Sequence, residues 1–184
     1  FYWAYANYLD SMALVEEMYK HVIHETFGTY QFKIGDFQVN FEGDWKKIDY
    51  RGTLLTNLGI DILTATKDEL KIKAKELKLD FNPNDTKGRL IDTLWKSIRK
   101  EIAGPVFLAG HPVEVSPLAK RNAKNPELVE RYQVIIAGSE MGNGYSELND
   151  PIDQADRFKK QQAMREAGDE EAQMHDEDFV RALE

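Results

Sequence analysis

The stretch RYQVIIAGSEMGNGYSELNDPIDQADRFKKQ, residues 131–161, decides the fold. Residues 132–137 are mostly β-branched and aromatic, which predicts a buried strand. A glycine and a serine then permit a bend, and residues 140–148 alternate as a second strand in which two glycines allow close backbone approach. Asn-Asp-Pro at 149–151 places a capping side chain before a proline, which predicts a helix start. The predicted unit is therefore two adjacent strands followed by a helix.

These two strands carry a set of polar and aromatic side chains that we expect near one surface. They are Gln133, Glu140, Asn143, Tyr145 and Glu147. The last three share a face, because successive side chains of a strand alternate. An amide, an aromatic ring and a carboxylate in a row could hold an amine-bearing small molecule. The alternative is a solvated strand face with two turn glycines, and the pattern alone favours that alternative.

The composition is that of a globular domain without a membrane span. A chain of 184 residues with 42% hydrophobic and 11% aromatic residues can bury one core and at most a small appendage. The net charge of −8 argues against a protein whose whole surface binds nucleic acid. The absence of cysteine excludes disulfides and thiolate metal sites and favours the cytoplasm. No signal peptide is visible, and because Phe1 is not a natural start we expect the true N-terminus to be missing.

Charge is distributed unevenly along the chain. Residues 67–100 carry ten Lys/Arg and six Asp/Glu, whereas residues 147–184 carry five Lys/Arg and twelve Asp/Glu. The acidic end is explained by solvated helix faces. Residues 45–104 show apolar residues at helical spacing, interrupted by turn residues. This pattern predicts short helices near 51–58, 67–77 and 86–103.

The remaining segments predict a mixture of strands and helices. Alternating large and small residues predict a strand over Phe1–Asn7, and a helix is expected from Asp10 or Ser11 to a stop at Gly28. The other predicted elements are a hairpin over 30–34 and 37–41, a strand at 105–109, an extended segment at 113–118, and helices at 151–167 and 176–183.

Four segments resemble class II lysyl-tRNA synthetases between the second and third signature motifs of that family. They are FYWAYANY (1–8), HPVEVSPLAKRN (111–122), GNGYSELNDPIDQADRF (142–158) and AGDEEAQMHDEDFVRALE (167–184). The segments occur in the order of the family and span nearly the whole chain. The resemblance therefore implies an internal piece of such an enzyme.

The expected fold class is α+β. The resemblance implies a partial class II aminoacyl-tRNA synthetase sheet, antiparallel and flanked by helices, with a helical insertion. Residues 1–44 would be one part of the catalytic domain, with a strand, a helix and a hairpin. Residues 45–104 would be the helical insertion, and residues 105–184 would carry the lysine and ATP strands and the C-terminal helices.

The resemblance implies a cytoplasmic lysine–tRNA ligase, homodimeric as a whole, that activates lysine with ATP and transfers it to tRNA(Lys). Glu147 matches the residue that pairs with the ε-ammonium of lysine, assisted by the hydroxyl of Tyr2. Asn143 matches a polar contact to lysine, and Tyr145 matches the aromatic ring against its methylene stem. A carboxylate is the fitting partner, because charge-assisted hydrogen bonds are about twice as strong as neutral ones.

The resemblance also implies a magnesium site that holds the ATP phosphates. Glu140 matches a ligand of Mg²⁺ and of the bound ATP. Gln133 stands where relatives usually carry glutamate, so its amide would be a weaker ligand. No complete catalytic set lies within this piece, so we expect the piece alone to be inactive. We also expect it to self-associate through exposed sheet.

Two alternatives stay open. One is a synthetase paralogue that lysylates another acceptor, such as a protein side chain. The other is a helical module over 67–100 that binds tRNA or DNA without catalysis, since this segment resembles a helix–extended loop–helix module of the SAP type. An insertion packed on the catalytic sheet is favoured over this module, because the family resemblance continues on both sides.

Overall fold

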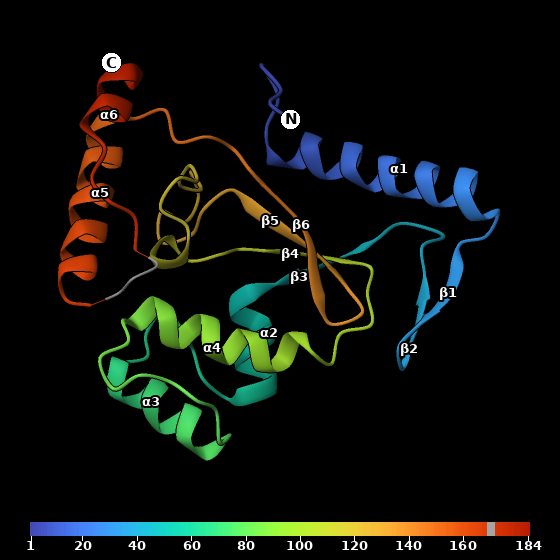
Figure 1. Ribbon diagram of the computed structural model, residues 1–184, viewed down its shortest axis with the longest axis horizontal. Coiled ribbons are helices and arrows are strands. Elements are labelled where there is room, and N and C mark those ends of the chain that lie inside the picture. Colours follow the sequence, from blue (N-terminus) through green and yellow to red (C-terminus); the bar gives the residue numbers. More distant parts are fainter. Residues whose placement is uncertain (169–171) are drawn as a thin grey trace.

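A four-stranded sheet forms the centre of the protein, with helices on both of its faces (Figure 1). The computed structural model describes residues 1–168 and 172–184. Helix α1 and a separate hairpin cover one face, and helices α2–α4 cover the other. Helices α5 and α6 lie beyond one end of the sheet. This mixed arrangement confirms the predicted α+β class.

The order of the strands in the sheet is β3-β4-β5-β6. They span Lys46–Asp49 (β3), Val106–Ala109 (β4), Arg131–Ile136 (β5) and Ser139–Tyr145 (β6). The β4–β5 and β5–β6 pairs are antiparallel, as expected, whereas β3 pairs parallel with β4. Sequence reasoning missed β3, because its pattern KKID has no clear alternation and its pairing depends on a strand 60 residues away.

Strand β5 is buried on both faces and supplies side chains to two separate cores. Tyr132, Val134 and Ile136 point toward α1, and Ile135 points toward α2–α4. This division follows from the alternation of side chains along a strand. A register shift between Val134 and Ile135 marks a bulge in the pairing with β6.

The first core joins α1 and the hairpin to the sheet. Helix α1 (Tyr8–Phe27) begins at a capping box formed by Asn7 and Asp10 and ends at Gly28. The predicted stop is confirmed, and the start lies three residues earlier than expected. The hairpin of β1 (Gln31–Ile34) and β2 (Phe37–Asn40) is confirmed. A line of contacting aromatic rings connects it to the sheet through Phe32, Phe41, Trp45, Phe107 and Tyr132.

The second core joins α2–α4 to the sheet. The helices span Tyr50–Leu58 (α2), Lys67–Glu76 (α3) and Lys87–Arg99 (α4), close to the predicted ranges. Their buried side chains form one cluster with Val106, Leu108 and Ile135 of the sheet. The apolar faces of these helices are therefore buried against the sheet and against each other. This packing favours an insertion on the sheet over a free-standing nucleic-acid module.

Two local predictions are wrong. Residues 1–7 form no strand, and Tyr2 and Tyr5 are fully or almost fully exposed. A strand needs a neighbour for its backbone groups, and no described strand pairs with this segment. Residues 113–118 are not extended, because Val113–Val115 forms a 3₁₀ turn after Pro112.

Helix α5 (Pro151–Glu166) starts as predicted, with Asp150 accepting from the first backbone N–H groups. The short helix α6 (Glu177–Leu183) begins after its cap Asp176. None of the helices in the described ranges combines the length and apolarity needed to cross a membrane.

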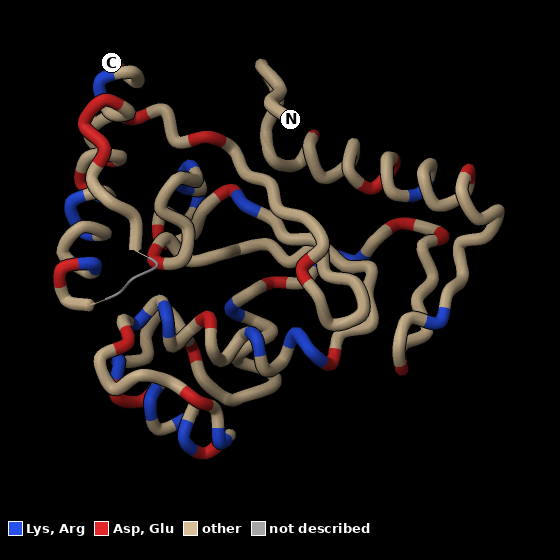
Figure 2. Tube along the Cα trace, viewed as in Figure 1, with Lys and Arg blue, Asp and Glu red and all other residues tan. Residues whose placement is uncertain are grey.

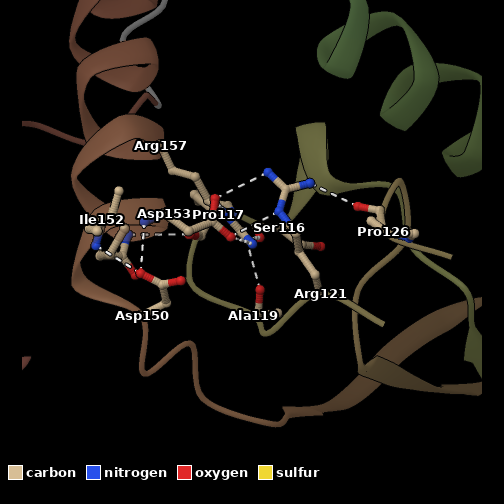
Figure 3. Close-up of polar contacts among 10 residues, drawn as sticks. Ser116, Pro117, Ala119, Arg121, Pro126, Asp150, Ile152, Asp153 and Arg157 are labelled. Atoms are coloured by element: carbon tan, nitrogen blue, oxygen red, sulfur yellow. Dashed lines mark hydrogen bonds and ion pairs between the residues drawn. The ribbon is translucent and has the colours of Figure 1, made fainter. Parts of the chain in front are cut away.

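An arginine–aspartate–arginine cluster ties α5 to the loop before β5 (Figure 3). Asp153 accepts two hydrogen bonds from each of Arg121 and Arg157. Arg157 is 4% exposed and also donates to the backbone oxygens of Ser116 (3.1 Å) and Ala119 (2.7 Å). A buried guanidinium is tolerated only when its donors are satisfied, so this cluster fixes the loop 116–121 against α5.

We predict that Asp153→Asn lowers the free energy of unfolding by about 3 kcal/mol at pH 7, because Arg157 stays buried without its counter-charge. The hydrogen bond and charge of Arg157, then those of Arg121, hold the pKa of Asp153 well below its usual range. A carboxyl with a lowered pKa stabilises the fold above about pH 4 and loses this contribution as the pH falls. Urea unfolding at several pH values should show the free energies of unfolding of the two proteins converging at low pH.

Asp156→Asn, on the exposed side of the same helix, is the control and should change the free energy of unfolding little. A difference between Asp153→Asn and the unaltered protein that is the same at all pH values would contradict the role given to the Asp153 carboxylate.

We also predict that Gly144→Ala destabilises the protein by about 1–3 kcal/mol, because the added methyl overpacks the sheet. A Cβ at Gly144 would lie 2.5 Å from the hydroxyl oxygen of Tyr132, which bonds Ser11 of α1 at 2.8 Å. Gly142→Ala is the matched control, since the nearest atom to its Cβ would be a methyl group of Val134 at 3.2 Å. Equal losses for the two variants in urea unfolding would show that the Tyr132 ring does not set this limit.

Candidate functional site

The four residues expected to bind lysine line one open cleft of about 840 Å³. The cleft follows β6 and the segment after it, and it is bounded by the first residues of the chain and by α1. Tyr2, Asn143, Tyr145 and Glu147 all contribute to its walls. The structure therefore brings these four residues together, whereas Gln133 and Glu140 lie outside this lining.

Backbone pairing with the loop 116–121 positions Glu147. Ala119 and Glu147 form an antiparallel bridge, and the backbone N–H of Lys120 donates to the oxygen of Ser146 at 2.8 Å. The hydroxyl of Ser146 accepts from the backbone N–H of Tyr8 at 3.1 Å, which attaches the start of α1 to the same place. The arginine cluster described above holds this loop from the other side.

The Glu147 carboxylate is exposed and makes no hydrogen bond or ion pair with any described residue. Partial burial raises the pKa of Glu147. A carboxylate that is partly desolvated and unpaired is destabilised in its charged form, and a cation placed beside it would remove that cost. Glu147 is therefore suited to accept a positively charged ligand.

Arg131 engages one end of the Asn143 amide. The guanidinium of Arg131 donates to Oδ1 of Asn143 at 2.8 Å, and also to the backbone oxygen of Val115 and the hydroxyl of Ser116. Because its amide oxygen is already engaged, Asn143 presents its NH₂ group as a donor. Burial lowers the pKa of Arg131, although its three acceptors keep it in place.

The two tyrosines of the cleft differ in how firmly they are held. Tyr145 is half-buried, and burial followed by the charge of Glu147 raises the pKa of its hydroxyl. Tyr2 is 92% exposed on the rim of the cleft. Tyr145 is therefore packed against the protein in the cleft, whereas Tyr2 is almost fully exposed at its rim.

Gln133 and Glu140 form a pair on the β5–β6 hairpin. Nε2 of Gln133 donates to Oε2 of Glu140 at 2.7 Å, and Asn143 lies directly opposite Gln133 in the strand register. No group of three or more His, Asp and Glu side chains suited to a metal occurs among the described residues. Glu140 is the one carboxylate of this pair.

Sequence reasoning missed the residues that organise these polar groups. Arg131 donates to both Asn143 and Ser116, and His111 lies buried beside Gln133. The only signal for Arg131 was its place in the alternation, on the same face as Gln133. His111 gave none, since a His-Pro pair is typical of a turn.

Comparison with known proteins gives a consistent result. The family model of tRNA synthetases class II (D, K and N) matches residues 1–184. The lysine–tRNA ligase of Thermosipho africanus is 45% identical over 183 residues, and the match covers 100% of this chain but 36% of that relative. The lysine–tRNA ligases of Pelotomaculum thermopropionicum and Bacillus subtilis are 40% and 39% identical, each with 37% of its length covered. The chain thus spans little more than a third of the length of these relatives. It belongs to the class II tRNA synthetases (D, K and N).

Proposed function

We propose that this chain is part of a lysine–tRNA ligase, which activates lysine with ATP, releases pyrophosphate and transfers the lysine to tRNA. The names of its relatives support this reading. The observation that carries it is the unpaired carboxylate of Glu147 in a cleft that Tyr2, Asn143 and Tyr145 also line. These are the residue types that recognise a long cationic side chain.

Each side chain of the cleft has a role that its surroundings support. Glu147 accepts the ε-ammonium of lysine, because the charge of the ligand offsets the partial desolvation of the carboxylate. The half-buried ring of Tyr145 packs along the methylene stem, and Asn143 donates its NH₂ to an oxygen of the ligand. Tyr2 contributes its hydroxyl to the ammonium when the ligand draws it into the cleft.

Magnesium is part of the same proposal. Bound Mg²⁺ neutralises charge on the phosphate oxygens of ATP. With a single carboxylate from Glu140 on this hairpin, the ion would be held jointly by that carboxylate and by the phosphates, which is the usual arrangement for magnesium. The sequence-based prediction that Gln133 is a weaker ligand of the same ion is untested, and the hydrogen bond from its Nε2 to Glu140 supports an alternative role in which it orients that carboxylate.

The proposal extends to the whole protein. We place it in the cytoplasm as a homodimer that takes lysine, ATP and tRNA, with residues 45–104 as an insertion between two parts of the catalytic domain. A paralogue that lysylates another acceptor would share the lysine cleft and differ in the transfer step. Incubation of the whole protein with radiolabelled lysine, ATP and total tRNA distinguishes the two, because a tRNA ligase places the label on tRNA.

We predict that Glu147→Gln in the whole protein reduces lysine activation by about 2–5 kcal/mol, because the ammonium loses its counter-charge in a partly desolvated cleft. Lysine-dependent ATP–pyrophosphate exchange measures the effect as a loss in kcat/KM for lysine. Glu130→Gln removes another carboxylate that lines the same cleft and is the matched control. If the two variants behave alike, or if Glu147→Gln leaves both constants unchanged, Glu147 does not bind the substrate.

A further inference from the structure

The amide nitrogen of Gln133 makes a hydrogen bond, whereas its amide oxygen makes none with the described residues. Gln133 is 8% exposed, and its Nε2 donates to Oε2 of Glu140 at 2.7 Å. Its Oε1 is buried and has no hydrogen-bond partner among the described residues. A buried amide oxygen without a donor costs about 1–3 kcal/mol, so a donor is expected beside it.

His111 is the side chain placed to supply that donor. It is 1% exposed, lies against the side chain of Gln133, and neither of its ring nitrogens has a partner of good geometry within the described ranges. An imidazole ring carries at least one N–H donor in either protonation state, so His111 can supply the donor that Oε1 of Gln133 lacks.

Packing fixes the place of the His111 ring. Its centroid lies 5.1 Å from that of Tyr50, which is itself 5.2 Å from the ring of Trp95. All three residues line one cavity of about 270 Å³ together with Gln133 and Arg131. The ring is thus held in the same cavity as the amide of Gln133.

We propose that His111 donates its ring N–H to Oε1 of Gln133, and that this contact holds the NH₂ group of Gln133 toward Glu140. Gln133 is then a positioning residue that aims the Glu140 carboxylate, and it is not a ligand of the metal. The role given to Glu140 rests on the proposed function, whereas the contact between His111 and Gln133 does not.

The reverse orientation of the amide is unfavourable at its Glu140 end, where it would set Oε1 against a carboxylate oxygen. At the other end the imidazole could accept from the NH₂ group through its unprotonated nitrogen, so the Glu140 end decides the orientation. Ligation of Mg²⁺ through Oε1 would require the same reversal. In this chain Gln133 stands in place of a second carboxylate, and its hydrogen bond orients the carboxylate of Glu140. Residues that hydrogen-bond to a metal ligand commonly have this role.

The first experiment uses the whole protein and the magnesium dependence of lysine-dependent ATP–pyrophosphate exchange at fixed ATP. His111→Phe and Gln133→Met should each raise the half-saturating magnesium concentration about tenfold. The double variant should shift no further, because both changes break one line of contacts. Tyr50→Phe keeps a ring against His111 and is the control. Additive shifts, or an unchanged His111→Phe variant, would overturn the proposal.

The second experiment does not depend on activity. In the substrate-free whole protein labelled with ¹⁵N-glutamine, the side-chain amide signal of Gln133 is identified by its loss in Gln133→Met. It should move in both His111→Phe and Glu140→Gln and stay in place in Tyr50→Phe. A signal that ignores His111→Phe contradicts the proposal, as would a crystal structure with Mg²⁺ and ATP in which Oε1 lies about 2.1 Å from the ion. Absence of lysine-dependent exchange in the unaltered protein would instead contradict the proposed function, and the amide signal would still decide the contact.

Discussion

The pairing of β5 with its two neighbours is the constraint on which the rest of the structure depends. Because β5 is buried on both faces, each of its side chains is committed to one of two cores or to the polar end of the sheet. Moving its register by one residue would exchange Tyr132 and Val134 with Gln133 and Ile135, and so would bury an amide in the aromatic core. The same register sets Asn143 opposite Gln133 and Tyr145 opposite Arg131. The core and the candidate site are therefore fixed by a single alignment.

Two guanidinium groups support the site by binding the segment before β5. Arg131 donates to Val115 and Ser116, and Arg157 donates to the backbone oxygens of Ser116 and Ala119. Figure 2 shows Lys and Arg positions interspersed with Asp and Glu positions along α3, α4 and α5. Breaking one of these contacts would free the loop 116–121, and Glu147 would lose the strand-like partner that positions it.

The sequence was sufficient where local pattern and tertiary structure agree. The hairpin, the helices, the stop at Gly28 and the unit from β5 to α5 each follow from alternation, helical spacing or capping residues. It was insufficient where a partner decides the outcome. Residues 1–7 have the alternation of a strand without a neighbour to pair with, and β3 has a neighbour without the alternation. For the site, the resemblance gave Glu147, Asn143 and Tyr145, whereas Arg131 and His111 act through contacts that no spacing reveals.

Among the described residues, the polar groups of the arginine–aspartate cluster are hydrogen-bonded within the chain, whereas the carboxylate of Glu147 is not. Arg157 and Asp153 use their hydrogen-bonding capacity within the chain, which is what a structural role requires. Glu147 keeps an unpaired carboxylate at the cleft, although partial burial makes the charge costly. Buried polar atoms of His111 and Gln133 also have no hydrogen-bond partner among the described residues, and Gln133 is paired with Asn143 in the sheet. A fold selected for stability alone would pair or remove the carboxylate of Glu147, so its unpaired state supports the proposed lysine cleft.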